Sequence, residues 1–269
     1  MIATAPHLST VLRHFQFLRE RTSPKTVDMR TMTGMRSLAV IGVSLFAAPL
    51  GHVQEQPSRI SWAPSYSGSC TDCSLMGSNM SGWNISKLNY PGADLTAANL
   101  QRVHGHHANF KAAQATGADL RLGDFTGAIF EQATLTGARL QHATFNSANM
   151  GGALLTGANL SDGKFIGAVL SDAKLQASTV HNADFSAATL SGASLSAADL
   201  TGSVFDNAVL QDADLTGANL TDVSFRDVRF TGAKLDSAVG IESANFEGAC
   251  ASETTQLPVG LSLPDCVSF

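Results

Sequence analysis

One cluster of side chains in the sequence could bind a metal ion: the three histidines of the run His104-Gly105-His106-His107. Neutral imidazole side chains bind transition metals, so His104, His106 and His107 are a candidate surface metal site. The competing interpretation is a solvated edge, because the sequence fixes no carboxylate or cysteine beside them. We therefore expect no cofactor, and we keep surface metal binding as an alternative function.

The second group is four cysteines: Cys70, Cys73, Cys250 and Cys266. A C-x-x-C pair such as Cys70 and Cys73 is found in redox dithiols, in zinc sites and in disulfides. The alternating strands and helices of a redox domain do not follow it, and two cysteines cannot supply the four ligands of a structural zinc ion. Disulfides are the favoured interpretation, and four cysteines allow three pairings.

Catalytic motifs and a nucleic-acid-binding charge are both missing from the sequence. The patterns G-x-S-x-G, G-x-x-x-x-G-K-[ST] and H-E-x-x-H do not occur. The 17 Lys and Arg residues against 22 Asp and Glu give a formal net charge of −5, which disfavours a protein that neutralises phosphates. The sequence therefore predicts a protein that is not an enzyme and does not bind nucleic acid directly.

The histidines and the first cysteine pair lie in or next to a region of the sequence with a strict five-residue period. Every fifth residue from Leu75 to Leu235 is large and apolar, and only Gly105 and Ala115 break the series of 33. Two residues before each of these positions the side chain is nearly always small: it is Ala in 22 of the 33 units and Gly, Ser or Cys in six more. A period of five matches neither the helix period of 3.6 nor the strand period of two.

The repeated text is A-[DN]-L-x-x, as in Ala93-Asp94-Leu95 and Ala218-Asn219-Leu220. It resembles the pentapeptide-repeat family over residues 73–238, without a gap. The resemblance implies an all-β fold, a right-handed quadrilateral β-helix with four repeats per coil, and no common enzymatic activity.

The sequence supports a 20-residue coil independently of that resemblance. One phenylalanine series and one leucine series each recur every 20 residues: Phe125, Phe145, Phe165, Phe185, Phe205, Phe225, and Leu135, Leu155, Leu175, Leu195, Leu215, Leu235. If 20 residues make one turn, each series stacks as a column in the core, with neighbours separated by the strand spacing of about 4.8 Å. About eight such coils give a rod about 40 Å long.

The two ends of the rod are expected to differ from its middle. Trp83 and Leu88 stand where later coils carry Ala, which predicts an irregular first coil. After Leu235 the register is lost, and Phe246 resumes the pattern one residue late. Because the rod separates the two cysteine pairs by far more than the roughly 4.4–6.8 Å that a disulfide spans, we predict Cys70 bonded to Cys73, and Cys250 bonded to Cys266.

The chain is divided, on this basis, into an N-terminal extension (1–28), a signal peptide (29–51), a linker (52–69), the repeat region (70–249) and a C-terminal cap (250–269). Met29, Met32 and Met35 are alternative translation starts. Arg30 and Arg36 precede an apolar run at 38–50 that is shorter than the roughly 20 residues of a membrane span. We therefore predict a secreted or periplasmic protein, with no stable membrane insertion after cleavage; an N-terminal membrane anchor is the competing interpretation.

The predicted function is that of an exported interaction or structural rod. Its partner would be an unidentified protein or envelope component, and the apolar Phe269 suggests a homodimer through the C-terminal cap. The resemblance supplies an alternative for a cytoplasmic chain, since some pentapeptide-repeat proteins bind DNA gyrase by mimicking DNA. About 40 Å of duplex carries on the order of 20 negative charges. Residues 70–249 hold 17 acidic and 10 basic residues, a net charge of −7, which disfavours the mimic.

Overall fold

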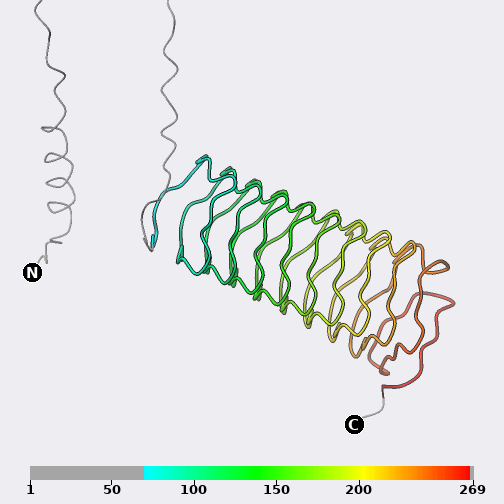
Figure 1. Ribbon diagram of the computed structural model, residues 1–269. Coiled ribbons are helices and arrows are strands. Elements are labelled where there is room, and N and C mark those ends of the chain that lie inside the picture. The colour runs from blue at the N-terminus through cyan, green and yellow to red at the C-terminus, as the bar shows by residue number, and fades with distance from the viewer. Residues whose placement is uncertain (1–69, 267–269) are drawn as a thin grey trace, which may run out of the picture. The chain divides into compact units, whose positions relative to one another are not determined.

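The computed structural model describes residues 70–266, and these residues form a stack of coils without helices (Figure 1). The predicted extension, signal peptide and linker, and Phe269 in the cap, lie outside the described residues. Within 70–266, no helix has the length and apolar character needed to cross a membrane.

Regular parallel pairing holds successive coils together. From Ser74 to Val239 every fifth residue is a single-residue strand that pairs with the residue 20 positions away, as in Ser74 with Asp94. Four such pairs per 20 residues give the coil four sides. We number the sides by their first pairing residues: side 1 at Ser74, side 2 at Asn79, side 3 at Asn84 and side 4 at Asn89.

The interior is a solid hydrocarbon core built from columns of identical residues. The phenylalanine series of the sequence is fully buried and stacked, with ring centroids of Phe145 and Phe165 separated by 5.2 Å and those of Phe165 and Phe185 by 4.6 Å. The leucine series is also fully buried. A second aromatic column runs through Tyr90, Phe110 and Phe130. Burying each such side chain contributes about 2 kcal/mol before the entropy of ordering the chain is subtracted.

The Asp or Asn of the repeat stabilises the corner that follows it. Its side-chain oxygen accepts a hydrogen bond from the backbone N–H two residues on: Asp94 from Thr96 at 3.0 Å, and Asn99 from Gln101 at 3.1 Å. The second corner residue is often in the left-handed region, with φ of 54° at Arg102. The Asp or Asn of the repeat therefore stabilises the local turn, and this hydrogen bond occupies part of the accepting capacity of its side-chain oxygen.

The interruption at Gly105 has a steric cause. A Cβ atom at this position would lie 2.8 Å from Cδ1 of Phe125, the residue stacked above it in the next coil. A Cβ at Gly123 would lie 2.5 Å from the same ring. The space left by the missing side chain at Gly105 is thus occupied by the first ring of the phenylalanine column.

The ends differ from what the sequence suggested in one respect. The prediction of an irregular first coil was wrong. Asn79 and Asn84 already pair with residues 20 positions away. Trp83 and Leu88 are half-buried and pack against the core. They are tolerated because they lie in the first coil of the described stack, where no described coil lies on one side of them. No insertion is needed to make room.

At the other end the coil gains one residue. Asn219 still pairs with Val239, but Ser224 pairs with Asn245, a separation of 21. Gly240, with φ of 76°, lies in this insertion, and a Cβ there would meet the backbone nitrogen of Thr221 at 2.5 Å. The phenylalanine column nevertheless continues, because Phe225 stacks on Phe246 with ring centroids 5.3 Å apart.

The packing at Gly105 predicts the effect of adding a single methyl group. Gly105→Ala should destabilise the fold by about 1–3 kcal/mol, because its backbone accepts Ala but its space is filled by the Phe125 ring. Combining it with Phe125→Leu should remove the clash, so that the two substitutions cost less together than the sum of their separate effects. Urea denaturation of the four proteins measures this coupling; simple additivity would contradict the proposed contact.

Candidate functional site

Within residues 70–266 the core is filled by side chains, so a partner of this part of the chain meets its outer surface. Five polar residues are buried in the described part: Asp119, Ser178, Ser194, Ser203 and Asp206. The three serines make hydrogen bonds within the stack. Ser178 donates to the backbone oxygen of Leu175 at 2.7 Å, and Ser203 accepts from the backbone N–H of Ala183 in the neighbouring coil at 3.1 Å. The two carboxylates are the centres of larger polar networks on the surface.

Asp119, on side 2, is held by two arginines and a glutamine. Its Oδ1 accepts from Nε of Arg121 at 2.9 Å, and its Oδ2 accepts from Nη2 of Arg121 at 2.8 Å. Nη2 of Arg139 lies 2.8 Å from the same Oδ2, and Nε2 of Gln101 donates to it at 2.7 Å. Three coils therefore meet at this one carboxylate.

The arginines set the charge state of Asp119. Burial by itself would raise the pKa of this carboxyl group, but the hydrogen bonds from Arg121 and the positive charges of Arg139 and Arg121 more than compensate and lower the pKa below its ordinary value. Asp119 in turn raises the pKa of the Arg121 guanidinium. The carboxylate is thus a fixed anion that orients two cations, and it is unsuited to proton transfer near neutral pH.

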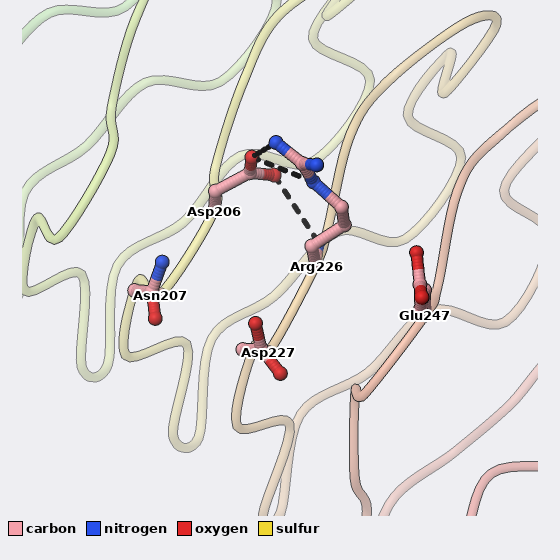
Figure 2. A pocket seen from close by; sticks show the side chains of 5 residues that line it. All are labelled: Asp206, Asn207, Arg226, Asp227 and Glu247. Carbon is pink, nitrogen blue, oxygen red and sulfur yellow. Dashed lines mark hydrogen bonds and ion pairs between the residues drawn. The ribbon is translucent and has the colours of Figure 1, made fainter.

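Asp206 is the centre of a second network, near the C-terminal end of the stack. Nε of Arg226 donates to its Oδ2 at 2.9 Å, and the hydroxyl of Ser224 donates to its Oδ1. Figure 2 shows the pair at a depression that Asn207, Asp227 and Glu247 also line. Burial would raise the pKa of Asp206, but Arg226 and Ser224 lower it overall. Besides Arg226 and Asn207, the lining residues are the three acids Asp206, Asp227 and Glu247.

The three candidate metal ligands do not converge. His104 lies on side 3, with His106 and His107 at the corner after it. Nε2 of His106 lies 3.1 Å from Oδ2 of Asp124, and both side chains are partly exposed. Residues 70–266 contain no group of three or more His, Cys, Asp or Glu side chains arranged to hold a metal ion.

The two predicted cysteine pairs lie at disulfide distance. The Cα atoms of Cys70 and Cys73 are 5.6 Å apart, and those of Cys250 and Cys266 are 4.9 Å apart. The second pair fastens the tail to the end of the stack, where the backbone N–H of Cys266 donates to the oxygen of Ala251 at 2.8 Å.

The Asp119 network is a feature that our sequence analysis missed. Arg121 is two residues from Asp119, but Gln101 and Arg139 lie 18 and 20 residues away in the sequence, so no local motif joins the whole network. The 20-residue period would have placed Arg139 directly next to Asp119 in the neighbouring coil, and a comparison of outward residues one coil apart could have found the pair.

Family models identify this chain. "Pentapeptide repeats (8 copies)" matches residues 92–127 and 124–162, and "Pentapeptide repeat region" matches residues 158–235. Together they span more than half of the chain, which therefore belongs to the pentapeptide-repeat family, as the A-[DN]-L-x-x unit predicted. Members of this family fold as right-handed β-helices. No curated protein matches the chain significantly.

Solved structures of pentapeptide repeat proteins are similar to this chain. HetL from the cyanobacterium Nostoc sp., involved in heterocyst differentiation regulation, is 26% identical over 69% of this chain and 88% of its own, with a TM-score of 0.26. A protein from the Arabidopsis thaliana thylakoid lumen is 34% identical over 39% of this chain and 69% of its own, with a TM-score of 0.21. QnrB1, a plasmid-mediated fluoroquinolone resistance protein, is 16% identical over 69% of this chain and 91% of its own, with a TM-score of 0.39.

The charge state of Asp119 predicts how stability depends on pH. Because its pKa in the folded protein lies below the unfolded value of about 3.9, Asp119 stabilises the fold fully above that value, and this contribution is lost as pH falls through the lowered pKa. Asp119→Asn should cost about 1–3 kcal/mol at neutral pH and make the loss of stability in acid shallower. Thermal melting between about pH 2 and 7 measures both effects.

Asp162→Asn is the matched control. Asp162 is exposed, has a left-handed backbone that Asn also accepts, and its ion-pair partner within residues 70–266 is His142, at 3.7 Å. Its replacement should change stability by less than about 0.5 kcal/mol. If both variants melted like the original protein at every pH, the stabilising role of the Asp119 network would be refuted.

Proposed function

We propose that this chain is an exported, non-enzymatic rod that binds a protein or envelope component along its side. About eight coils present four rigid outer sides, and the partner contacts outward side chains whose positions are fixed by the pairing of successive coils. The single observation that carries the proposal is the filled interior: the large inward side chains from Met80 to Leu235 are buried, so recognition is left to the surface.

The carboxylates on the described surface are held in ion pairs and turns, and this supports a binding role rather than acid–base catalysis. The two buried carboxylates, Asp119 and Asp206, each form an ion pair with arginine. Many of the other surface carboxylates accept hydrogen bonds from their own corners, as Asp214 does from the backbone N–H of Thr216 at 3.0 Å. An acid–base pair needs a group with its pKa near the working pH, and these contacts move carboxyl pKa values away from it.

Export is supported by two independent features. The sequence places an apolar run behind Arg30 and Arg36, and both cysteine pairs lie at disulfide distance at the ends of the stack. Disulfides form and persist in oxidising compartments, and a short covalent link is useful where a stack has an open end.

The gyrase-binding alternative finds no support in the charge pattern. The acidic residues of 150–249 are spread over sides 1, 2 and 3 and over the corners between sides rather than lying in one stripe, and Asp206 is paired with Arg226. A mimic of duplex DNA needs a continuous negative surface facing its partner. Export would also separate the chain from a cytoplasmic topoisomerase.

Cell fractionation tests the proposal. The full chain with a C-terminal tag, expressed in its host, should be found outside the cytoplasm and should have lost its N-terminal segment, as N-terminal sequencing would establish. Peptide mapping of the unreduced protein should recover Cys70 linked to Cys73 and Cys250 linked to Cys266. Recovery of the intact, fully reduced chain in the cytoplasm would overturn the proposal. Deletion of residues 38–50 is the control, and it should abolish export because it removes the apolar run.

A further inference from the structure

The charge of the described repeat region is divided unevenly along its length. Residues 70–149 contain five Asp or Glu and five Lys or Arg, together with four His. Residues 150–249 contain twelve Asp or Glu and five Lys or Arg, so this half alone carries the net charge of −7. An anionic partner is therefore repelled by the C-terminal half and is accepted only by the N-terminal half.

Three arginines gather on the N-terminal half, at side 2 and the corner that follows it. The backbone N–H of Arg102 donates to the backbone oxygen of Arg121 at 3.0 Å, so these residues lie side by side in successive coils. Arg121 and Arg139 share Oδ2 of Asp119. We call Arg102, Arg121, Leu122 and Arg139 the arginine face.

The arginine face has a local excess of positive charge. Asp119 is its one carboxylate. Two other carboxylates of this part of the stack are paired with histidines: Asp124 on side 3 with His106, and Asp162, further along the corner column of Arg102 and Leu122, with His142. The side chains of Arg121 and Arg139 remain 38% and 54% exposed, and Arg102 is exposed with no ion pair or side-chain hydrogen bond in residues 70–266. Three cations against one anion leave a net charge of +2.

Two of the three arginines of the face are held in place before any ligand arrives. Asp119 accepts hydrogen bonds from two nitrogens of Arg121 and forms an ion pair with one nitrogen of Arg139. The side chain of Asp119 is only 5% exposed. Guanidinium groups match carboxylate and sulfate oxygens through paired hydrogen bonds. Ordering Arg121 and Arg139 in advance lowers the entropic cost of binding.

Leu122 gives the face an apolar element. It is 47% exposed and has a φ of 60°, a backbone conformation that Gly, Asn or Asp adopts more readily than Leu. Its position lies between those of Arg102 and His142 in the same corner column. A sugar ring has an apolar C–H face and polar edges, so it can pack on such a side chain while its anionic group meets an arginine.

We propose that the arginine face binds an anionic polysaccharide, a chain of sugars that carry carboxylate or sulfate groups. This inference rests on the proposed function and names the class of envelope component that the rod binds. A single polysaccharide chain can cross the stack at its N-terminal half, whereas a bilayer or a long duplex would also face the acidic half. A protein partner is less suited, because the exposed large apolar residues of 70–266 include no aromatic side chain.

The test is a binding titration with the purified full chain. The probes are heparin for sulfate groups, polygalacturonate for carboxylate groups and dextran as the neutral polymer. We expect binding to at least one anionic probe at about 50 mM NaCl, loss of that binding at about 500 mM NaCl, and none to dextran. The double variant Arg102→Gln/Arg139→Gln should weaken binding about fivefold or more, while Arg121 still holds Asp119.

Lys164→Gln/Lys174→Gln is the matched control, because it removes the same charge from two exposed lysines outside the arginine face. It should leave the affinity within about twofold. Equal weakening by both variants would reduce the effect to overall charge and overturn the inference, as would failure of both anionic probes to bind. Stronger binding to anionic lipid vesicles or to duplex DNA, with the same sensitivity to the arginines, would also overturn it and assign the face to a different partner.

Failure here is distinguishable from failure of the proposed function. If the chain is exported and oxidised but binds neither anionic probe, the proposal of an exported rod stands and only the proposal of polysaccharide binding is rejected. A chain retained in the cytoplasm loses the exported role whatever it binds in the titration.

Discussion

The interior of the coil is so narrow that each five-residue unit can place one large and one small side chain inside, and the rest of the structure depends on this limit. Beyond the first coil the largest residue found at the small position is Val, as at the buried Val103 and Val223, and a smaller residue at the large position would leave a void that costs stability. The strict spacing follows, because one inserted residue moves every later side chain out of its column. The insertion at Gly240 is tolerated only near the end of the repeats, where Phe246 restores the column one residue late.

The same limit separates stability from function. With the interior filled by Leu, Phe and Ala, a substitution inside the stack affects packing, whereas the outward residues of the sides and corners can vary without disturbing the columns. Parallel pairing places those outward residues next to their counterparts about 4.8 Å away in the next coil. Polar networks such as that of Asp119 then form between coils, and they fix surface side chains that would move freely on an isolated strand.

Much of the fold could be predicted from the sequence, because periodicity is the only information the columns need. Phe145 and Phe165 stack because they are one coil apart, and no knowledge of rotamers is required to place them together. The role of Gly105 could not be predicted in this way: the ring of Phe125 fills its space through the direction of a side chain, which the period does not specify. The contacts on the surface were harder still to predict from the sequence, because Asp119 binds Gln101, Arg121 and Arg139 through their long, flexible side chains.

The distribution of charge, rather than its total, decides what the surface can recognise. A net charge of −5 predicts that the whole molecule repels anions at long range. At contact distance the relevant length is the Debye length of about 8 Å at physiological salt, which is less than two coils. Arg102, Arg121 and Arg139 therefore act within a local field that the distant acidic half hardly changes. The acidic half acts earlier, during approach, by turning a long polyanion toward the N-terminal coils, so that one rod combines local attraction with orientation of its partner.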